Sequence, residues 1–575
     1  MFVMYAATDQ GRRAAIQSRH PHWIEMSLDF YLESAGRSFR ARPLVITDDK
    51  TLTYGEVIQQ KRRVAAALQS MGLRSGDRVG ILMANHADVV PLIFAVWSIG
   101  AVAVPFNTLY RADELVFALR QSGCAALITM QHIFGRNIPA ELDVIEPDWR
   151  QGSFGQLPEM KTIKVFGVEK SNLVSFEALI DCQQPNEEVK RTSCANPSHT
   201  AVIMYTSGST GLPKGVMHTH DSLLRAAYCN AYHHAYEDGR RAIFSLPLYH
   251  TYGLVTGLLS GLMVGGGIIA HTQFDAVRML SAIGTHRATW LLAVPTMTVA
   301  LLKEAEQRSY DLSSLKAIHS AAAPTPSWVW RKIKDTLGVD KVFTSYGQTE
   351  TSMITCTQSG DSLETVSLTQ GVLALGGAAG IPELGHHPIA NVRIIDPETG
   401  KVLPDGVTGE LCTKGPTNTI GYFRNEAETA ALFTPDGWLK MGDLGRFRED
   451  GNLVLVGRSK DVFKSRGELV SPKELEELLT THAGISQAFV IGMPDERSGE
   501  CGCAWIVRAN PNLEADDIAR FLETRVARYK MLRDIWFIED HQLPKTGTGK
   551  IQKQFLRDRA RKILAKEKVV DGLSE

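Results

Sequence analysis

The most informative segment of the chain is rich in glycine, serine and threonine and contains a lysine near its end. It reads YTSGSTGLPKG over residues 205–215, and the apolar run 201–205 is expected to form a buried strand leading into it. Glycines and short hydroxyl side chains leave backbone N–H groups free to face phosphate oxygens, and Lys214 adds a positive charge. The spacing differs from the Walker pattern because Pro213-Lys214-Gly215 follows the glycines. The segment therefore predicts a phosphate-binding loop rather than a surface linker.

Five further segments follow this loop in a fixed order. They read PLYHTYG (247–253), SYGQTE (345–350), GWLKMGDLG (437–445), GRSKDVFKSRGELVSP (457–472) and PKTGTGKI (544–551). Together with the loop they resemble the motifs of the adenylate-forming superfamily, which includes acyl-CoA synthetases, firefly luciferase and the adenylation domains of peptide synthetases. The resemblance extends over nearly the whole chain and is closest to the acyl-CoA synthetases. It implies an acid–thiol ligase that uses ATP, Mg²⁺ and coenzyme A.

The same resemblance implies which residues bind the nucleotide. Tyr346 would lie against the adenine ring, and Asp443 and Arg458 would bind the ribose. Glu350 and Thr206 would hold the Mg²⁺ that bridges the phosphates, since hard oxygen ligands suit a hard cation. The other residues expected to line the ATP or AMP site are Ser207, Gly208, Ser209, Thr210, Gly211, Lys214, Ala322, Ala323, Pro324, Ser345, Gly347, Gln348 and Thr349.

The family mechanism has two half-reactions. The carboxylate of the acid attacks the α-phosphate of ATP, which gives acyl-AMP and pyrophosphate, and Lys550 would neutralise charge between these two anions. Glu350, Thr206 and His250 are the other expected catalytic residues. A small C-terminal domain would then rotate about a hinge at Lys460, so that a pantetheine thiol can attack the mixed anhydride. The residues expected to contact coenzyme A are Lys464, Arg466, Gly467 and Glu468. For Arg466, a surface residue without a role in binding is an equally open alternative.

The acid-binding pocket can be described only as a class. Peptide-synthetase domains hold the substrate amino group with an aspartate after the phenylalanine of their fourth motif, whereas Tyr249-His250-Thr251 contains no acid. The walls are mostly apolar or small, which predicts a hydrophobic acid of the fatty, alicyclic or aryl type. Ser320-Ala-Ala-Ala-Pro324 replaces the commoner Ser-Gly-Gly-Ala-Pro, and the added methyl groups would narrow the floor of the acid-binding pocket. The expected pocket residues are Tyr249, His250, Val255, Thr296, Ser320, Ala321, Ala322 and Met353.

Three alternatives remain open at this level. The acyl group could be loaded onto the phosphopantetheine of a carrier protein instead of coenzyme A. A luciferase-type oxidative second step and a degenerate relative that only binds are further alternatives, although Lys214, Glu350, Asp443, Arg458 and Lys550 are all intact. A homodimer is also compatible with the sequence.

These motifs require a particular framework of helices and strands. An amphipathic helix at 54–71 and apolar runs at 78–83, 124–129 and 241–246 alternate in the manner of an α/β protein with parallel sheets. Past about residue 400, Asp-Gly turns predict a β-rich subdomain over about 385–457. We expect a large domain over 1–457 and a mobile α+β domain over 458–575. The latter should contain a helix from Ser471-Pro472, strands at 487–491 and 503–507, and a helix at 516–528.

Composition and charge exclude several other classes. The 575 residues are 44% hydrophobic and 22% charged with a net charge of −1, so no global field attracts nucleic acid or an anionic membrane. The uncharged runs 253–270 and 89–107 are interrupted by glycine or proline and are expected to be buried elements rather than membrane spans. The eight cysteines are scattered and are expected to be buried or free thiols, and no signal-peptide core is present. We therefore expect a cytoplasmic enzyme.

Overall fold

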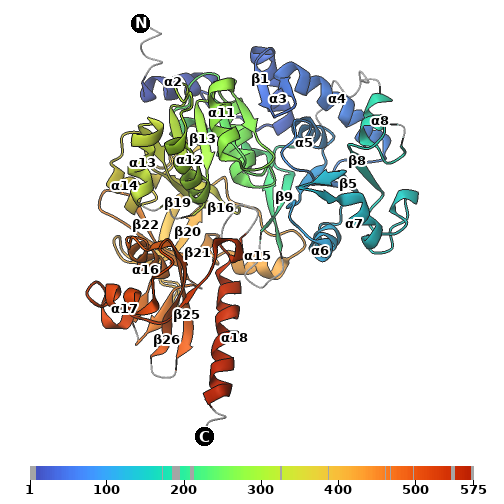
Figure 1. Ribbon diagram of the computed structural model, residues 1–575. Helices are drawn as coiled ribbons and strands as arrows, with labels where there is room; N and C mark the ends of the chain where they lie inside the picture. Colours follow the sequence, from blue (N-terminus) through green and yellow to red (C-terminus); the bar gives the residue numbers. More distant parts are fainter. Residues whose placement is uncertain are drawn as a thin grey trace.

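A computed structural model describes residues 8–170, 172–183, 195–206, 213–323, 325, 327–385, 387–459, 461–466, 468–495, 498–545 and 551–571. Two large sheets form the body of the molecule (Figure 1). The first has the order β15 (Lys341–Phe343), β14 (Ala317–Ser320), β13 (Trp290–Ala293), β11 (Arg241–Phe244), β12 (Gly267–Ala270), β1 (Pro43–Ile46) and β2 (Thr51–Thr53). The second has the order β10 (Lys214–Thr219), β9 (Thr200–Thr206), β4 (Val102–Pro105), β3 (Arg78–Leu82), β5 (Ala126–Met130) and β8 (Thr162–Phe166).

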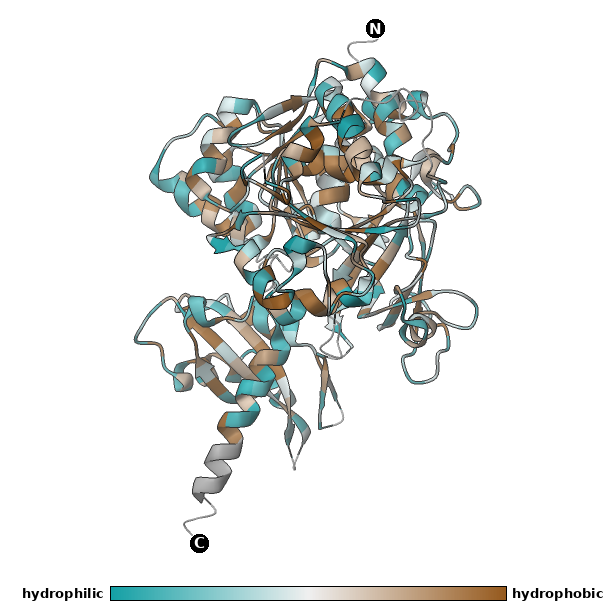
Figure 2. Ribbon diagram, turned by 90° about the vertical axis from the view of Figure 1, so that its right-hand side faces the viewer, coloured by the Kyte–Doolittle hydropathy of each residue, from teal (hydrophilic) through white to brown (hydrophobic). Residues whose placement is uncertain are grey.

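Pairing in both large sheets is mainly parallel, as the alternation of helices and strands predicts. The helices that connect and cover these strands include α2 (Asp9–Arg19), α3 (Leu28–Phe39), α4 (Tyr54–Ser70), α5 (Val89–Ser98), α6 (Ala112–Ser122), α7 (Ile138–Ile145), α8 (Phe176–Asp181), α9 (His220–His233), α11 (Ala276–His286), α12 (Pro295–Gln307) and α13 (Ser327–Leu337). Figure 2 shows apolar residues concentrated along the strands and the helix faces against them, with polar residues on the outer helix surfaces. One continuous core therefore joins the two sheets, and it includes residues of α4, α5 and α9.

Two smaller sheets complete the upper part of the molecule. One contains β16 (Ser345–Gln348), β17 (Ser352–Cys356) and β18 (Val372–Leu373). The other is an antiparallel sheet of β19 (Asn391–Ile395), β20 (Gly409–Lys414), β21 (Leu439–Phe447) and β22 (Leu453–Arg458), in the region expected to be β-rich. Two short helices, α14 (Leu363–Leu368) and α15 (Glu426–Leu432), lie in the connections.

The C-terminal part has a sheet of its own, with the order β24 (Glu468–Val470), β23 (Phe463–Ser465), β26 (Gly499–Arg508) and β25 (Ile485–Asp495), and β27 (Leu532–Phe537) paired to β26. Its helices are α16 (Pro472–Leu479), α17 (Ala515–Glu523) and α18 (Lys553–Asp571), and α18 extends away from the body (Figure 1). Ser471 caps α16, as the Ser-Pro pair suggests. The prediction for α17 was too long, because the chain leaves the helix after Glu523 and enters a 3₁₀ turn at Arg528–Lys530.

The two uncharged runs form buried elements, as expected. Residues 253–270 contribute a π-helix, η2 (Tyr252–Leu259), then α10 (Ser260–Leu262), a turn and β12. Residues 89–107 contribute α5 and β4, whose side chains are nearly all buried. Across the described ranges, the helices are too short or too polar to cross a bilayer.

Candidate active site

The strand before the phosphate loop and the strand after it pair with each other. β9 and β10 are antiparallel, and their register places Thr206 opposite Lys214 at the open end of the pair. The loop between them must therefore begin and end at the same place, between these two side chains. The loop residues Ser207, Gly208, Ser209, Thr210 and Gly211 lie outside the described residues.

Lys214 and Glu350 both contact the side chain of Tyr422, Lys214 over the ring and Glu350 at the hydroxyl. The Lys214 ammonium lies 5.1 Å from the centre of the ring and forms an ion pair with Glu428 of α15, with Nζ and Oε2 2.5 Å apart. The Tyr422 hydroxyl donates a hydrogen bond to Oε1 of Glu350 at 2.9 Å. A cation and a carboxylate are thus placed around one tyrosine, which suits a site for a metal-bound polyphosphate.

The backbone around Glu350 is held by two further contacts. The amide of Thr419 donates to the Glu350 carbonyl at 2.6 Å, and the imidazole Nε2 of His218 lies 2.5 Å from the Thr349 carbonyl. His218 is buried, and burial lowers its pKa to about 4, so the ring is neutral and donates this bond. These contacts hold the turn after β16 against β10.

The predicted adenine and ribose residues form one hydrogen-bonded group. Asp443 accepts through Oδ2 from the Tyr346 hydroxyl at 2.6 Å and from the Gln348 amide at 2.7 Å, and its Oδ1 lies 3.1 Å from the Arg458 Nε. The antiparallel register of β21 and β22 pairs Asp443 directly with Arg458. Burial and the neighbouring Asp443 carboxylate raise the pKa of Tyr346 well above its usual value, so its hydroxyl stays protonated. Three sequence motifs therefore meet at Asp443.

The strand that carries Tyr346 leaves no room for a larger residue at Gly347. A β-carbon there would come within 1.8 Å of the Ser352 carbonyl on the paired strand β17. Ser352, the first residue of β17, has a positive φ of 56°. Ala322 also has a positive φ, of 71°, and is exposed, while Ala323 is half-buried beside it; Pro324 lies outside the described residues. These backbone conformations shape the floor on which a nucleotide is expected to lie.

The expected acid-pocket residues lie on η2, α12, β14 and β17 and on the segments that follow β11 and β14. The Tyr252 hydroxyl, on η2, donates to the His319 carbonyl at 2.7 Å and so holds η2 against β14 next to Ser320. Burial lowers the pKa of His250 to about 4, which leaves a neutral imidazole packed against Tyr249 with ring centres 4.9 Å apart. Ser320 is fully buried and its hydroxyl lies 3.1 Å from that of Thr298. Tyr249, Val255, Ala321 and Met353 are buried, whereas Thr296 is exposed.

Three of the residues expected to contact coenzyme A, Lys464, Arg466 and Glu468, are described, and they lie at β23 and β24. Lys464 forms an ion pair with Glu398, 3.0 Å apart, and both side chains are exposed. Arg466 has a positive φ of 54°, and its amide donates to the Ser498 carbonyl at 2.9 Å. Glu468 is exposed, and Lys460, Gly467 and Lys550 lie outside the described residues. The described members of this group lie on one exposed hairpin and are not shown to contact the nucleotide-binding group.

Tyr422, Glu428 and His218 take part in the site but were not predicted from the sequence. Tyr422 and Glu428 belong to the segment 415–432, which carries Thr419 as well. The only signal available was the dense run of small, aromatic and acidic residues before GWLKMGDLG, and no spacing rule connects it with Lys214. Their contribution becomes visible only through tertiary contacts.

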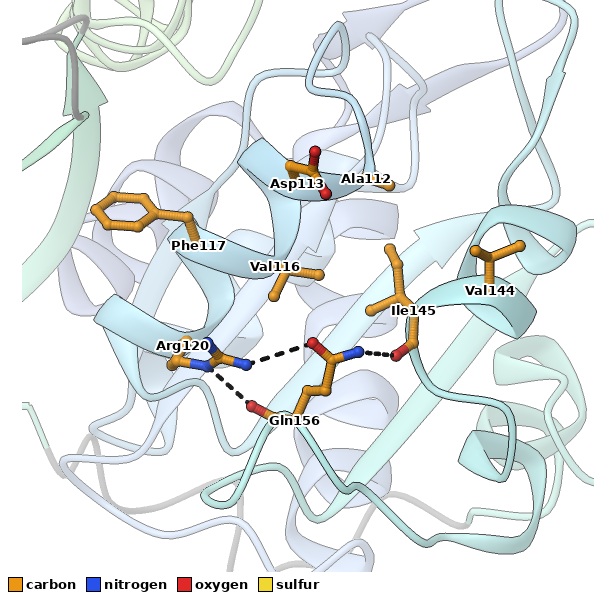
Figure 3. A pocket seen from close by; sticks show the side chains of 8 residues that line it. All are labelled: Ala112, Asp113, Val116, Phe117, Arg120, Val144, Ile145 and Gln156. Carbon is orange, nitrogen blue, oxygen red and sulfur yellow. Dashed lines mark hydrogen bonds between the residues drawn. The ribbon is translucent and has the colours of Figure 1, made fainter.

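A separate cavity of about 260 Å³ lies between α6, α7 and the loop that contains Gln156 (Figure 3). Arg120 donates from Nε to the Gln156 carbonyl at 3.0 Å, and the Gln156 amide donates to the Ile145 carbonyl at 2.8 Å. The cavity contains no residue of the six motifs. The described motif residues lie instead in the groups around Tyr422 and Asp443.

Comparisons with known proteins agree with this geometry. The model of the AMP-binding enzyme family matches residues 32–423, and that of the AMP-binding enzyme C-terminal domain matches 474–550. The chain is 32% identical over 550 residues to a putative acyl-CoA synthetase YngI of Bacillus subtilis, covering 93% of this chain and 97% of the relative. It is 30% identical to the mitochondrial medium-chain acyl-CoA ligase ACSF2 of Danio rerio, covering 91% of this chain and 86% of the relative.

A solved structure supports the same assignment. The anthranilate CoA ligase AuaEII, in complex with anthranoyl-AMP, superposes with a TM-score of 0.82 at 26% identity, covering 94% of this chain and 99% of the other. The similarity extends over a large N-terminal and a small C-terminal domain, as the sequence predicts. With the family models covering most of its length, this chain belongs to the AMP-binding enzyme family and is an AMP-forming acid–thiol ligase of the acyl-CoA synthetase type.

Proposed function

We propose that this protein is an ATP-dependent acyl-CoA ligase that converts a hydrophobic carboxylic acid to an acyl-adenylate and then to its CoA thioester. The observation that carries the proposal is the group of Tyr346, Gln348 and Arg458 around Asp443, next to the pair of Lys214 and Glu350 around Tyr422. The first group offers stacking and ribose-binding atoms, and the second offers charges of both signs for a metal-bound triphosphate.

In the first half-reaction, the chain has to bring two anions together. Lys214 and Lys550 would supply positive charge to the phosphates and to the attacking carboxylate, which lowers the repulsion in the transition state. Asp443 would accept hydrogen bonds from the ribose hydroxyls. Burial alone would lower the pKa of Arg458, but the neighbouring Asp443 carboxylate raises it, so Arg458 keeps its charge. The neutral His250 would border the carboxylate without adding charge of its own.

The residues present fit a magnesium ion. Glu350 has a half-buried carboxylate held in place by Tyr422, and Thr206 ends β9 on the phosphate-loop side, so both offer the hard oxygen ligands that Mg²⁺ prefers. Glu350 and Thr206 would hold the ion, which when bound neutralises the phosphate oxygens. Tyr422 positions the Glu350 carboxylate, and the chain supplies the remaining charge through Lys214.

The apolar character of the pocket residues supports a hydrophobic acid. Tyr249, Val255, Ala321 and Met353 are buried, and the described pocket residues include no cation that would pair with a second carboxylate. One relative is a medium-chain acyl-CoA ligase and one structural neighbour an anthranilate CoA ligase, which agrees with a fatty or aryl acid here. The seven cysteines described as free thiols support a reducing compartment such as the cytoplasm.

The test measures pyrophosphate and AMP release by the full-length enzyme with a panel of fatty, alicyclic, aryl and amino acids. We expect CoA-dependent AMP release with a hydrophobic acid and none with amino acids. AMP release that requires a phosphopantetheinyl carrier protein instead of CoA would assign the acyl group to a carrier. Absence of pyrophosphate release with every acid would overturn the proposal in favour of a binding protein.

The role of Lys550 is tested by separating the half-reactions. Lys550→Ala should lower acyl-AMP formation by about 100-fold or more, because a positioned cation is lost from the transition state. Thioester formation from supplied acyl-AMP should stay close to that of the unmodified enzyme. Equal losses in both half-reactions would show that Lys550 does not act in adenylation alone.

A further inference from the structure

Behind the nucleotide-binding strands lies a buried group of two histidines and a cysteine. His234 follows α9, His319 lies in β14 and Cys356 ends β17, and all three side chains are buried. One nitrogen from each imidazole and the cysteine sulfur all lie within 4.8 Å of one another. Elements that are distant in sequence therefore bring three metal-ligating side chains together outside the six motifs.

The hydrogen bonds of the two histidines orient both rings towards Cys356 and leave one ring nitrogen unpartnered. His234 Nδ1 lies 2.7 Å from the Asn230 carbonyl, so it must donate, and its Nε2 accepts a hydrogen bond from the Cys356 thiol, with nitrogen and sulfur 3.4 Å apart. His319 Nε2 lies 2.9 Å from the Ser345 hydroxyl, while its Nδ1 is fully buried and has no hydrogen-bond partner. Each ring is thus held by one outer hydrogen bond, as metal-bound histidines are, and a cation that displaced the thiol proton would take the place of the bond between Cys356 and His234.

Burial disfavours the charged form of all three groups. It lowers the pKa values of His319 and His234 and raises that of the Cys356 thiol, so a cation that binds here must displace the thiol proton. A buried ring nitrogen without a partner is costly and is expected to have an occupant.

The separation between the ligand atoms of His234 and Cys356 suits a metal of tetrahedral or trigonal preference. With metal–sulfur and metal–nitrogen bonds of about 2.3 and about 2.0 Å, neighbouring ligand atoms lie about 3.5 Å apart. The observed 3.4 Å between His234 Nε2 and Cys356 Sγ is close to this separation. We propose that His234, His319 and Cys356 form a binding site for a single thiophilic d¹⁰ cation, Zn²⁺ or Cu⁺.

The surroundings of the site restrict the charge of its occupant. The group contains no carboxylate, so only the Cys356 thiolate, formed when the cation displaces the thiol proton, offsets the metal charge. The Arg240 guanidinium lies 4.0 Å from the centre of the Tyr236 ring, which stacks on His234 with ring centres 5.5 Å apart. This buried positive charge opposes a divalent ion and favours Cu⁺, for which sulfur and imidazole are suitable ligands.

The site is connected to the nucleotide-binding strand. His319 contacts the Ser345 hydroxyl, and Ser345 begins β16, where it pairs with Cys356 across the hairpin. A bound cation would link α9, β14 and β17 directly behind Tyr346. Its role is to stabilise this part of the enzyme, and it takes no part in the reacting groups.

The first test measures metal content in the full-length enzyme. After loading with Zn²⁺ or Cu⁺ and removal of excess, we expect about one ion per chain in the unmodified enzyme and less than about 0.2 in Cys356→Ser and His319→Gln. Cys124→Ser is the matched control, because Cys124 is also fully buried but lies in a different core cluster. Equal metal content in Cys356→Ser and Cys124→Ser would overturn the proposal.

The second test uses the unmodified enzyme and does not depend on the folding of a variant. Titration of metal-free enzyme with Co²⁺ should produce a thiolate-to-cobalt charge-transfer band, which the all-oxygen Mg²⁺ site cannot give. Competition with Zn²⁺ and with Cu⁺ in separate arms then decides which ion binds more tightly. Absence of the band together with an unchanged melting temperature on addition of either ion would overturn the proposal, whether or not the ligase activity is found.

Discussion

At the scale of single residues, Asp443 contacts three other described residues of the predicted site. Both of its oxygens are used, by Tyr346 and Gln348 on one side and by Arg458 on the other. Replacing it by asparagine removes the charge that these donors share and would weaken binding of the ribose.

We expect Asp443→Asn to raise the KM for ATP by about 10- to 100-fold, since hydrogen bonds to charged groups contribute about 1.5–3 kcal/mol each. The measurement is pyrophosphate release at varied ATP concentration. Asp436→Asn serves as the control, because Asp436 is an exposed aspartate that pairs with Arg393 away from the site. A KM for ATP equal to that of the control would contradict the assignment of Asp443.

Tyr422 allows a test of how Glu350 is held. Tyr422→Phe removes one hydrogen bond to the carboxylate and leaves the ring under Lys214, so we expect a loss of about 5- to 10-fold in kcat/KM for adenylation, equal to about 1 kcal/mol. Tyr310→Phe is the matched control, because Tyr310 donates the same kind of bond to Glu304 on the surface. An increased requirement for Mg²⁺ in Tyr422→Phe alone would support its positioning role, and equal activity of both variants would exclude it.

Residue-scale prediction from the sequence depends on local motif chemistry. The Tyr346, Gln348, Asp443 and Arg458 group was predicted as nucleotide-binding, and the structure brings these four side chains into contact. The roles themselves stay predictions. The group of His234, His319 and Cys356 could not be found in this way, because its members come from three elements and follow no spacing rule.

At the scale of elements, the β16–β17 hairpin depends on a residue without a side chain. A β-carbon at Gly347 would lie 1.8 Å from the Ser352 carbonyl. This carbonyl is a backbone atom of a paired strand, so a change of side-chain rotamer cannot relieve the clash. We expect Gly347→Ala to destabilise the enzyme by about 1–3 kcal/mol and to lower its affinity for ATP. Chemical denaturation and ATP binding measure these effects.

Gly385→Ala is the control for this change, since a β-carbon there has no neighbour within 4 Å and the residue has no positive φ. It should unfold at the same denaturant concentration as the unmodified enzyme. Similar stability of Gly347→Ala and Gly385→Ala would show that the hairpin can widen to accept the methyl group.

Element prediction was limited by tertiary effects. The helix predicted at 54–71 forms as α4, where Thr53 and Glu56 make a capping box. The buried helix predicted after Gly253 forms as a π-helix, which the apolar pattern does not distinguish from an α-helix. The boundary of α17 was misjudged because the continuing polar sequence carries no glycine or proline to mark its end.

At the scale of the whole molecule, buried neutral histidines set a limit on acid stability. Burial lowers the pKa of His218, His233 and His250 to about 4 and that of His220 to about 3. Because these values lie below the unfolded value of about 6.5, the unfolded chain binds more protons once the pH falls below that value. The stabilisation is therefore complete above about pH 6.5 and is lost as the pH falls towards about 4.

We expect the contribution of these histidines to the free energy of unfolding to be nearly constant from about pH 8 to about pH 7. Below about pH 6, each histidine should lower the free energy of unfolding by up to about 1.4 kcal/mol per pH unit. Urea denaturation at a series of pH values measures this. His218→Gln should show a smaller slope than the unmodified enzyme in the acid range. A slope that is the same in both would mean that His218 does not contribute.

The ion pair between Lys464 and Glu398 joins the predicted CoA-binding hairpin to the loop after β19. Both side chains are more than 60% exposed, so the pair is screened by salt and contributes about 0–1 kcal/mol. Such an interaction breaks and re-forms within the range of thermal energy. A higher ionic strength would therefore increase how often the hairpin leaves this position, whereas it leaves the buried group around Asp443 largely unaffected. Turnover with coenzyme A should consequently respond to salt more strongly than adenylation does.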